Sequence, residues 1–277
     1  MKKKETIAII SSTRADYGIL KNLIIKLKKE KNIKLKFIVS GTHFDKKYGR
    51  TLIHILKDKI KIDHKIPIKL GKSSKKNIIK NMAQYMIKIC DYYLRIKFKA
   101  IILLGDRYEM LAIASVANIL NIPLIHLYGG EITNGSYDNQ IRHAITKLSD
   151  YHFVSTLKSK KRVIQMGEEK KKVFLIGSLG VENLLIHQKK NNLLKIFKHT
   201  LNKKKLLICY HSQTNNINAS RKDLVNLLSA LKHFKNYSII FTYPNHDVDS
   251  EFIIQKIKTF CKNNKNSKMI SSLGQEN

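Results

Sequence analysis

The chain has 277 residues, 43% of them hydrophobic, which is enough for one large domain or two ordinary domains with a sizeable core. Lysine and arginine number 53 against 20 aspartates and glutamates, and the net charge of +33 raises nucleic acid, an acidic membrane or an anionic substrate as partners. Because the lysines are scattered and no zinc-finger or RNA-recognition motif accompanies them, we expect no specific nucleic acid partner, only non-specific binding at low salt.

Three features of the sequence indicate a cytoplasmic location. The three cysteines, Cys90, Cys209 and Cys261, are odd in number and far apart, which excludes a disulfide framework and any cysteine-pair metal site. The apolar run after the basic N-terminus is too short for a signal peptide. No run approaches the ~20 apolar residues of a membrane span. We therefore expect a reducing compartment, no membrane association and no metal.

The first 180 residues alternate short β-branched apolar runs with amphipathic helical patterns, an order that predicts a doubly wound parallel sheet. Strands are expected at 6–10, 36–39, 60–71 (an edge strand with its loop), 101–104, 123–127, 151–154 and 173–176. Helices are expected at 19–29, around 52–56, at 75–95, from 138 onward and at 158–166. No Gly-x-Gly-x-x-Gly follows Ile10 and no P-loop motif occurs, so standard dinucleotide and P-loop sites are not indicated.

A charged, asparagine-rich region at 182–205 is interpreted as a crossover into a second unit. In that unit strands are expected at 206–209, 238–241 and 268–273, and helices at 224–231 and 252–260. The sequence thus predicts an α/β protein of two Rossmann-like domains, residues 1–180 and residues 181–277. The second has three strands and no closing helix, so we expect it to be incomplete.

The centre of the chain places carboxylates after two expected strands. Each strand is followed by glycine and then by an acid, Asp106 in one case and Glu131 in the other. Ligands of open α/β sheets bind outside the carboxyl ends of the strands, so both acids are expected over one crevice. Asp138 opens a helical pattern that also carries Arg142 and His143. Such a set on a rigid scaffold suits proton transfer.

Each acid also has an ordinary structural explanation. Asp106 fits the N-cap of a following helix, where aspartate is favoured. Glu131 fits an exposed loop acid, and Asp138 fits a first-turn acid that interacts well with the helix dipole. Taken together, after two buried strands with glycine spacers, the three acids favour a functional site.

Two further side chains are expected at the same edge of the sheet. Arg14 follows the first strand, where a guanidinium suits a phosphate or a sugar hydroxyl, although a surface arginine fits the sequence equally well. His43 follows the second strand. A lone histidine there is more often a packing residue, so it receives a supporting role at most.

Several motifs stand out along the chain. In the first half they are S-S-T-R-A-D-Y-G, S-G-T-H-F, L-L-G-D-R-Y-E, H-L-Y-G-G-E-I-T-N-G, D-N-Q-I-R-H-A-I-T-K and L-I-G-S-L-G, and in the second Y-H-S-Q-T, Y-P-N-H-D-V-D-S and S-S-L-G-Q-E-N. These motifs resemble those of the hydrolysing UDP-N-acetylglucosamine 2-epimerases of bacterial sialic acid and capsule pathways. The combination of G-D-R-Y-E with G-G-E-I-T-N-G is specific to this family and its near relatives. The resemblance implies a glycosyltransferase-B fold and a homodimer, and we expect no cofactor.

Carried over position by position, the resemblance implies catalytic roles for Asp106, Glu131, Asp138 and His211. The substrate-binding residues that it implies are Arg14, Thr42, His43, Arg107, Arg142, His143 and Asn245. Ser212 stands where the family usually has proline, which leaves the placing of His211 open. The family's later serine- and glycine-rich segment, which grips the nucleotide diphosphate, is missing from the 277 residues, so the resemblance predicts a C-terminally truncated enzyme with little or no epimerase activity.

The implied reaction converts UDP-N-acetylglucosamine to N-acetylmannosamine and UDP. Carbon 2 of the sugar has no adjacent carbonyl to acidify its proton, so UDP must leave carbon 1 first or in concert. A carboxylate then removes the proton to give a glycal, and water adds with the opposite configuration at carbon 2. Nearby acids that raise one another's pKa suit these proton transfers, while His211 and Arg14 are candidates to stabilise the leaving diphosphate.

Other interpretations of the sequence stay open. One is the same chemistry on another nucleotide sugar, either a UDP-linked diacetamido-trideoxyhexose or a GDP-linked sugar, for legionaminic acid. A second is a truncated, inactive remnant that binds sugar nucleotides. A third is a basic nucleic-acid-binding protein. A glycosyltransferase of the same fold is less favoured, because the acids at the strand ends are epimerase features.

Overall fold

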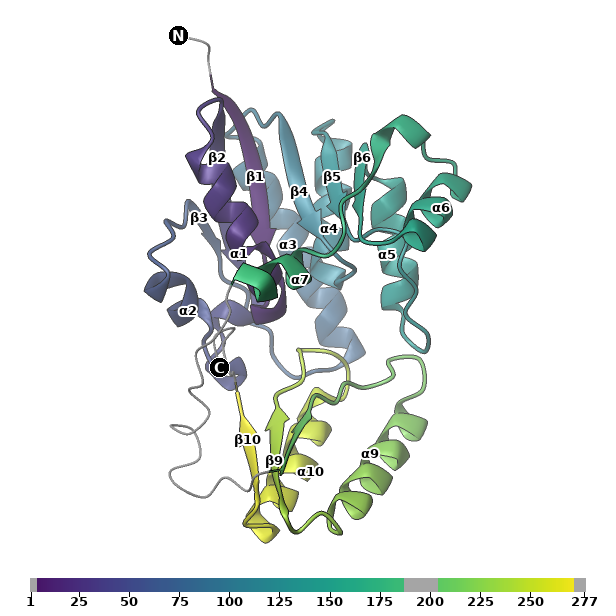
Figure 1. Ribbon diagram of the computed structural model, residues 1–277. Coiled ribbons are helices and arrows are strands. Elements are labelled where there is room, and N and C mark those ends of the chain that lie inside the picture. The colour runs from purple at the N-terminus through teal and green to yellow at the C-terminus, as the bar shows by residue number, and fades with distance from the viewer. Residues whose placement is uncertain (1–3, 187–203, 272–277) are drawn as a thin grey trace.

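The computed structural model describes residues 4–186 and 204–271, and its strands form two separate sheets (Figure 1). The larger sheet has seven strands in the order β3-β2-β1-β4-β5-β6-β7, and all neighbouring pairs are parallel. The strands are β1 Glu5–Ser11, β2 Ile33–Ser40, β3 His64–Ile66, β4 Ala100–Leu104, β5 Leu124–Leu127, β6 Tyr151–Val154 and β7 Val173–Leu175. The order grows outward in both directions from β1 and β4, which is the doubly wound arrangement that the sequence predicts.

Helices cover both faces of the larger sheet. They are α1 Arg14–Lys29, α2 Leu52–Lys57, α3 Lys75–Tyr93, α4 Tyr108–Ile119, α5 Asp138–Lys147, α6 Leu157–Gln165 and α7 Leu179–Ile186, with short 3-10 turns at Gly41–Phe44, Lys46–Tyr48 and Lys170–Lys172. Successive residues of β4 point to opposite faces. Ile101 and Leu103 share a core with α3 and α4, whereas Ile102 and Leu104 share one with α1. Because both faces are buried, β4 is apolar throughout, as is typical of parallel sheets.

The smaller sheet has three described strands in the order β10-β9-β8. They are β8 Lys204–Ile208, β9 Tyr237–Thr242 and β10 Ser267–Ile270, accompanied by α9 Ile217–Leu231 and α10 Ser250–Asn263. Both helices pack on this sheet around Ile239 and Phe241 of β9. We call β1–β7 with their helices the first unit and β8–β10 with α9 and α10 the second unit. Figure 1 shows the second unit beyond the carboxyl ends of β1 and β4.

Two helices begin earlier than the sequence pattern predicts, because polar residues form their first turns. α1 begins at Arg14 rather than at residue 19, since the hydroxyl of Thr13 caps it by accepting a hydrogen bond from the amide of Asp16. α9 begins at Ile217 rather than at residue 224, and the side chain of Asn216 caps it. Apolar periodicity alone therefore missed the capped first turns.

Helix α7 crosses the predicted boundary between residues 180 and 181. Its Asn183 donates a hydrogen bond of 2.7 Å to the carbonyl of Gly18 in α1, so α7 packs on the first unit. The expected crossover at 182–205 is thus helical up to Ile186, while residues 187–203 and 272–277 lie outside the described residues. The division into domains at this boundary stays a prediction. In the described ranges, no helix has the length and apolarity needed to cross a membrane.

Two isoleucines allow a matched test of the core. Ile101 in β4 is 0% exposed, whereas Ile119 at the end of α4 is 73% exposed. We expect Ile101→Ala to lower the free energy of unfolding by about 2–5 kcal/mol, because it removes buried methyl groups and leaves a cavity. Ile119→Ala should change it by less than about 0.5 kcal/mol. Urea titration followed by circular dichroism measures both, and equal effects would contradict the buried position of β4.

Candidate functional site

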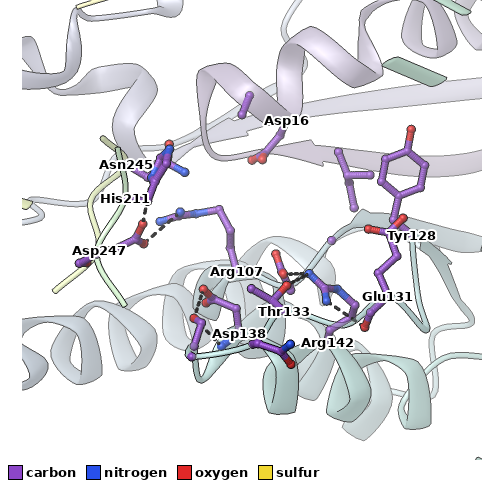
Figure 2. A pocket seen from close by; sticks show the side chains of 18 of the residues that line it. Asp16, Arg107, Tyr128, Glu131, Thr133, Asp138, Arg142, His211, Asn245 and Asp247 are labelled. Atoms are coloured by element: carbon purple, nitrogen blue, oxygen red, sulfur yellow. Dashed lines mark hydrogen bonds and ion pairs between the residues drawn. The ribbon is translucent and has the colours of Figure 1, made fainter. Parts of the chain in front are cut away.

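A cleft of about 500 Å³ opens between the two units, at the carboxyl ends of strands from both sheets (Figure 2). The three acids expected over one crevice, Asp106, Glu131 and Asp138, all line it. The other predicted site residues that line the cleft are Arg107, Arg142, His211 and Asn245. The structure therefore brings together seven of the eleven predicted site residues: the strand-end argument correctly placed the three acids, whereas Arg107, His211 and Asn245 were predicted from the resemblance.

Asp106 is fixed by an arginine from another element. Its carboxylate forms an ion pair with the guanidinium of Arg142 on α5. Arg142 also donates to the carbonyl of Glu131 (2.9 Å) and to the hydroxyl of Thr133 (3.0 Å), so it connects the loops that follow β4 and β5. The N-cap residue of α4 is Arg107, and its side chain makes no cap hydrogen bond. Asp106 is thus a paired cleft residue and not the helix cap that the sequence also allowed.

The other two acids are held by hydroxyl groups. Glu131 accepts a hydrogen bond from the hydroxyl of Ser155, which follows β6. Asp138 is the first residue of α5 and accepts one from Ser136. Burial raises the pKa of Asp138; the hydrogen bond from Ser136 opposes this shift, and the negative charge of Asp247 adds to it. A carboxyl group with a raised pKa can give and take protons closer to neutral pH, as general acid–base catalysis requires.

Arg107 connects the two walls of the cleft. Its Nε donates to Oε2 of the buried Glu109 (3.1 Å), and its Nη1 donates to Oδ1 of Asp247 in the second unit (3.2 Å). Figure 2 shows the side chain extended toward Asp247. Burial by itself would lower the pKa of Arg107, but the two carboxylates raise it, so the guanidinium stays charged. A buried arginine with two carboxylate partners is a strong and geometrically specific contact.

His211 reaches the cleft from the segment after β8, with 41% of its side chain exposed. Its Nδ1 lies 4.0 Å from Oδ2 of Asp247, and its Nε2 lies 3.3 Å from Sγ of Cys209. The contact with Cys209 raises the pKa of His211 most, and Asp247 raises it further. Ser212, in place of the family's usual proline, donates to the carbonyl of Val248 (2.7 Å) and anchors the segment. Because Cys209 and Asp247 raise the pKa of His211, its imidazolium form is favoured, and this form can stabilise developing negative charge.

Thr42 and His43, predicted to bind substrate, do not line this cleft. The hydroxyl of Thr42 donates to the carbonyl of Ser12 (3.1 Å). His43 is fully buried between the hydroxyl of Ser11 (2.9 Å) and that of Thr51 (2.8 Å). Burial lowers the pKa of His43 to about 4, so it is neutral at physiological pH. Both side chains satisfy hydrogen bonds within the first unit, which is the packing role that the sequence also allowed for His43.

Arg14 and His143 also lie outside the lining of this cleft. Arg14 is the first residue of α1, and its Nη1 donates to the carbonyl of Ser271 after β10 (3.2 Å). It therefore bridges the two units from outside the lining of the cleft. His143 follows Arg142 on α5, and residues one apart on a helix point in different directions, whereas Asp138 and Arg142, four apart, share a face.

The sequence analysis missed the two carboxylates that hold Arg107, namely Glu109 and Asp247, of which Asp247 lines the cleft. Both lie in motifs that resemble the family, G-D-R-Y-E and Y-P-N-H-D-V-D-S. The signal that could have found Asp247 is the one that found Asp106, an acid shortly after the carboxyl end of a buried strand. Glu109 gave no such signal, because in the sequence it is an ordinary acid in the first turn of a helix.

The chain is similar to known proteins over almost its whole length. The family model described as UDP-N-acetylglucosamine 2-epimerase matches residues 25–277. The chain is 39% identical to the GDP/UDP-N,N'-diacetylbacillosamine 2-epimerase (hydrolyzing) of Campylobacter jejuni, over 99% of this chain and 72% of that protein. It is 38% identical to the polysialic acid biosynthesis protein P7 of Escherichia coli, over 96% of this chain and 68% of that protein.

A solved structure shows the same fold. The UDP-GlcNAc 2-epimerase of Neisseria meningitidis, crystallised with UDP-GlcNAc, superposes with a TM-score of 0.78 at 18% identity, over 98% of this chain and 73% of that chain. The likeness confirms the predicted α/β fold of the glycosyltransferase-B type. The match over residues 25–277 and the identity of 39% to a relative over 99% of this chain establish that the chain belongs to the UDP-N-acetylglucosamine 2-epimerase family.

Proposed function

We propose that the chain catalyses the hydrolysing 2-epimerisation of a UDP-linked 2-acetamido sugar; the low activity expected from the sequence stays a prediction, which the rate of turnover of a UDP sugar by the chain tests. The observation that carries this proposal is the shared cleft, in which three carboxylic acids of the first unit face a histidine of the second. Family membership supports the class of reaction, and the acids and cations in the cleft supply the groups that it needs.

The reaction requires positive charge at the leaving diphosphate and proton transfer at carbon 2 of the sugar. Arg107 and His211 supply cationic groups at the cleft, and the raised pKa of His211 favours its charged form. Asp106, Glu131 and Asp138 are the candidates for removing the proton and returning one. Each general acid or base contributes about 10²–10⁴-fold, or about 3–5 kcal/mol. At least two such groups are therefore needed to approach the ~8 kcal/mol that enzymes supply at minimum.

Isotope labelling tests the reaction directly. Loss of UDP from carbon 1 followed by hydration of a glycal takes the new hydrogen at carbon 2 from solvent. In deuterium oxide the epimerised sugar should therefore carry deuterium at carbon 2. In ¹⁸O-water the label should appear in the sugar and not in UDP, because the bond between carbon 1 and oxygen breaks. Mass spectrometry measures both labels, and hydrolysis without inversion or deuterium uptake would refute the proposal.

Replacement of Asp106 tests whether this acid of the first unit takes part in the reaction. We expect Asp106→Asn to lower kcat about 10²–10⁴-fold, because it removes an ionisable group and the charged partner of Arg142. Asp223→Asn on the exposed side of α9 is the matched control and should retain full activity. UDP release in a coupled assay measures both rates. An Asp106→Asn enzyme as fast as the parent chain would remove this acid from the mechanism.

Two UDP sugars are candidate substrates: UDP-N-acetylglucosamine and UDP-N,N'-diacetylbacillosamine, which differs from it at carbons 4 and 6. The relative at 39% identity is named for this sugar, whereas the N. meningitidis structure with UDP-GlcNAc is 18% identical. We therefore expect kcat/KM to favour the diacetylated sugar about tenfold or more, a ratio that one or two pocket contacts can supply. Turnover of both UDP sugars and of the GDP-linked form measures the preference. A higher kcat/KM for UDP-N-acetylglucosamine would restore the substrate expected from the sequence.

Three further expectations stay predictions: a homodimer, a cytoplasmic location and the individual roles of Asp106, Glu131 and Asp138. The polysialic acid protein among the relatives supports a place for the product in surface polysaccharide synthesis.

A further inference from the structure

A cysteine that the proposed reaction does not use lies beside the histidine of the cleft. Cys209 directly follows β8 and is the exposed one among the three cysteines of the chain, whereas Cys90 and Cys261 are partly buried. Its Sγ lies 3.3 Å from Nε2 of His211. The two residues are separated by one residue in the segment that follows β8. Cys209 is thus exposed to solvent, and its thiol is hydrogen-bonded to His211, which lines the cleft.

The surroundings of Cys209 stabilise a thiolate. The hydrogen bond with His211 lowers the pKa of the thiol most, and burial opposes it. The Thr242 hydroxyl and the positive charge of Arg14 lower it further, and the resulting pKa is about 7. Two further charged groups act on His211: Asp247, which lies 4.0 Å from its Nδ1, favours the imidazolium, whereas the positive charge of Arg107 opposes it. A thiolate, rather than a thiol, is the nucleophile in cysteine chemistry.

A second observation points to an added group at this place. The side chain of Thr242 at the end of β9 faces the thiol closely enough to lower its pKa, and Thr242 is only 7% exposed. Its Oγ1 approaches the thiol without completing a hydrogen bond of good geometry, and it has no other hydrogen-bond partner among the described residues. A buried hydroxyl without a partner is unusual, because it forfeits hydrogen bonds to water. An oxygen atom in a group attached to Cys209 can accept the hydrogen bond that this hydroxyl lacks.

We propose that Cys209 is a covalent modification site for small soft electrophiles, and that modification there disables the cleft by separating His211 from its thiol partner. With iodoacetamide, Sγ attacks the methylene carbon, a sulfur–carbon bond forms, the carbon–iodine bond breaks, and iodide leaves with the bonding electrons. The thiol proton passes to Nε2 of His211. The adduct adds an amide oxygen that can accept a hydrogen bond from Thr242. Loss of activity then follows from the changed position and charge of His211.

The first test measures which cysteine reacts and at which pH. The folded chain is treated with iodoacetamide over a pH series, and mass spectrometry follows Cys90, Cys209 and Cys261 in the same sample. We expect Cys209 to react first, with the midpoint of its pH–rate profile near 7. A thiol of pKa about 8.5 has only about 3% thiolate at pH 7. Labelling in 8 M urea should make all three equal, and a folded chain in which Cys209 is no faster than the others would overturn the proposal.

The second test removes the imidazole. His211→Asn should move the midpoint of Cys209 labelling upward by more than about one pH unit, toward 8.5, because the largest cause of the lowered pKa is gone. His233→Asn, the same substitution at an exposed position after α9, should leave the midpoint unchanged. The midpoint is the readout because the intrinsic reactivity of a thiolate also changes with its pKa. An unchanged midpoint in His211→Asn would refute the role of this pair.

The third test concerns the cleft and rests on the proposed function. Labelling of Cys209 to completion should lower the rate of nucleotide-sugar turnover at least tenfold. The Cys209→Ser chain should keep its own rate after the same treatment, which shows that no other site is responsible. Full activity of the labelled parent chain would refute the disabling effect. If the parent chain turns over no nucleotide sugar, the proposed function fails, whereas the labelling order and the pH midpoints still decide the modification site.

Discussion

The ion pair between Arg107 and Asp247 is the contact on which the cleft depends, because it joins the two units across the space between the acids and the histidine. Arg107 is fixed from behind by Glu109, a carboxylate that is 0% exposed. Removing one partner of a buried ion pair leaves an uncompensated charge and costs about 3–5 kcal/mol. The guanidinium is therefore held in one orientation, and the separation of the two walls follows from it.

Other hydrogen bonds also join the two units. The hydroxyls of Ser136 and Thr214 lie 3.0 Å apart, and that of Tyr48 lies 2.7 Å from Nδ1 of His246. The two walls of the cleft also interact electrostatically. The negative charge of Asp247 in the second unit adds to the raised pKa of Asp138 in the first unit, so proton exchange at Asp138 depends on the presence of the second unit.

His211 is where the proposed reaction and the proposed modification site meet. One ring nitrogen faces Asp247, and the other contacts Cys209, so both neighbours favour the charged imidazole. When two titrating groups interact strongly, the protons belong to the pair and not to either residue. The charge needed at a leaving diphosphate and the reactivity of the thiol are therefore two consequences of one contact.

The sequence by itself determined the doubly wound sheet and the clustering of Asp106, Glu131 and Asp138, because buried parallel strands have a local signature and their carboxyl ends share one edge. Only the tertiary structure decided that His43 is buried in the first unit and that the cleft also needs Asp247. The reason is that neighbouring residues determine where a strand forms and ends, whereas the contacts of a side chain depend on elements far away in the chain.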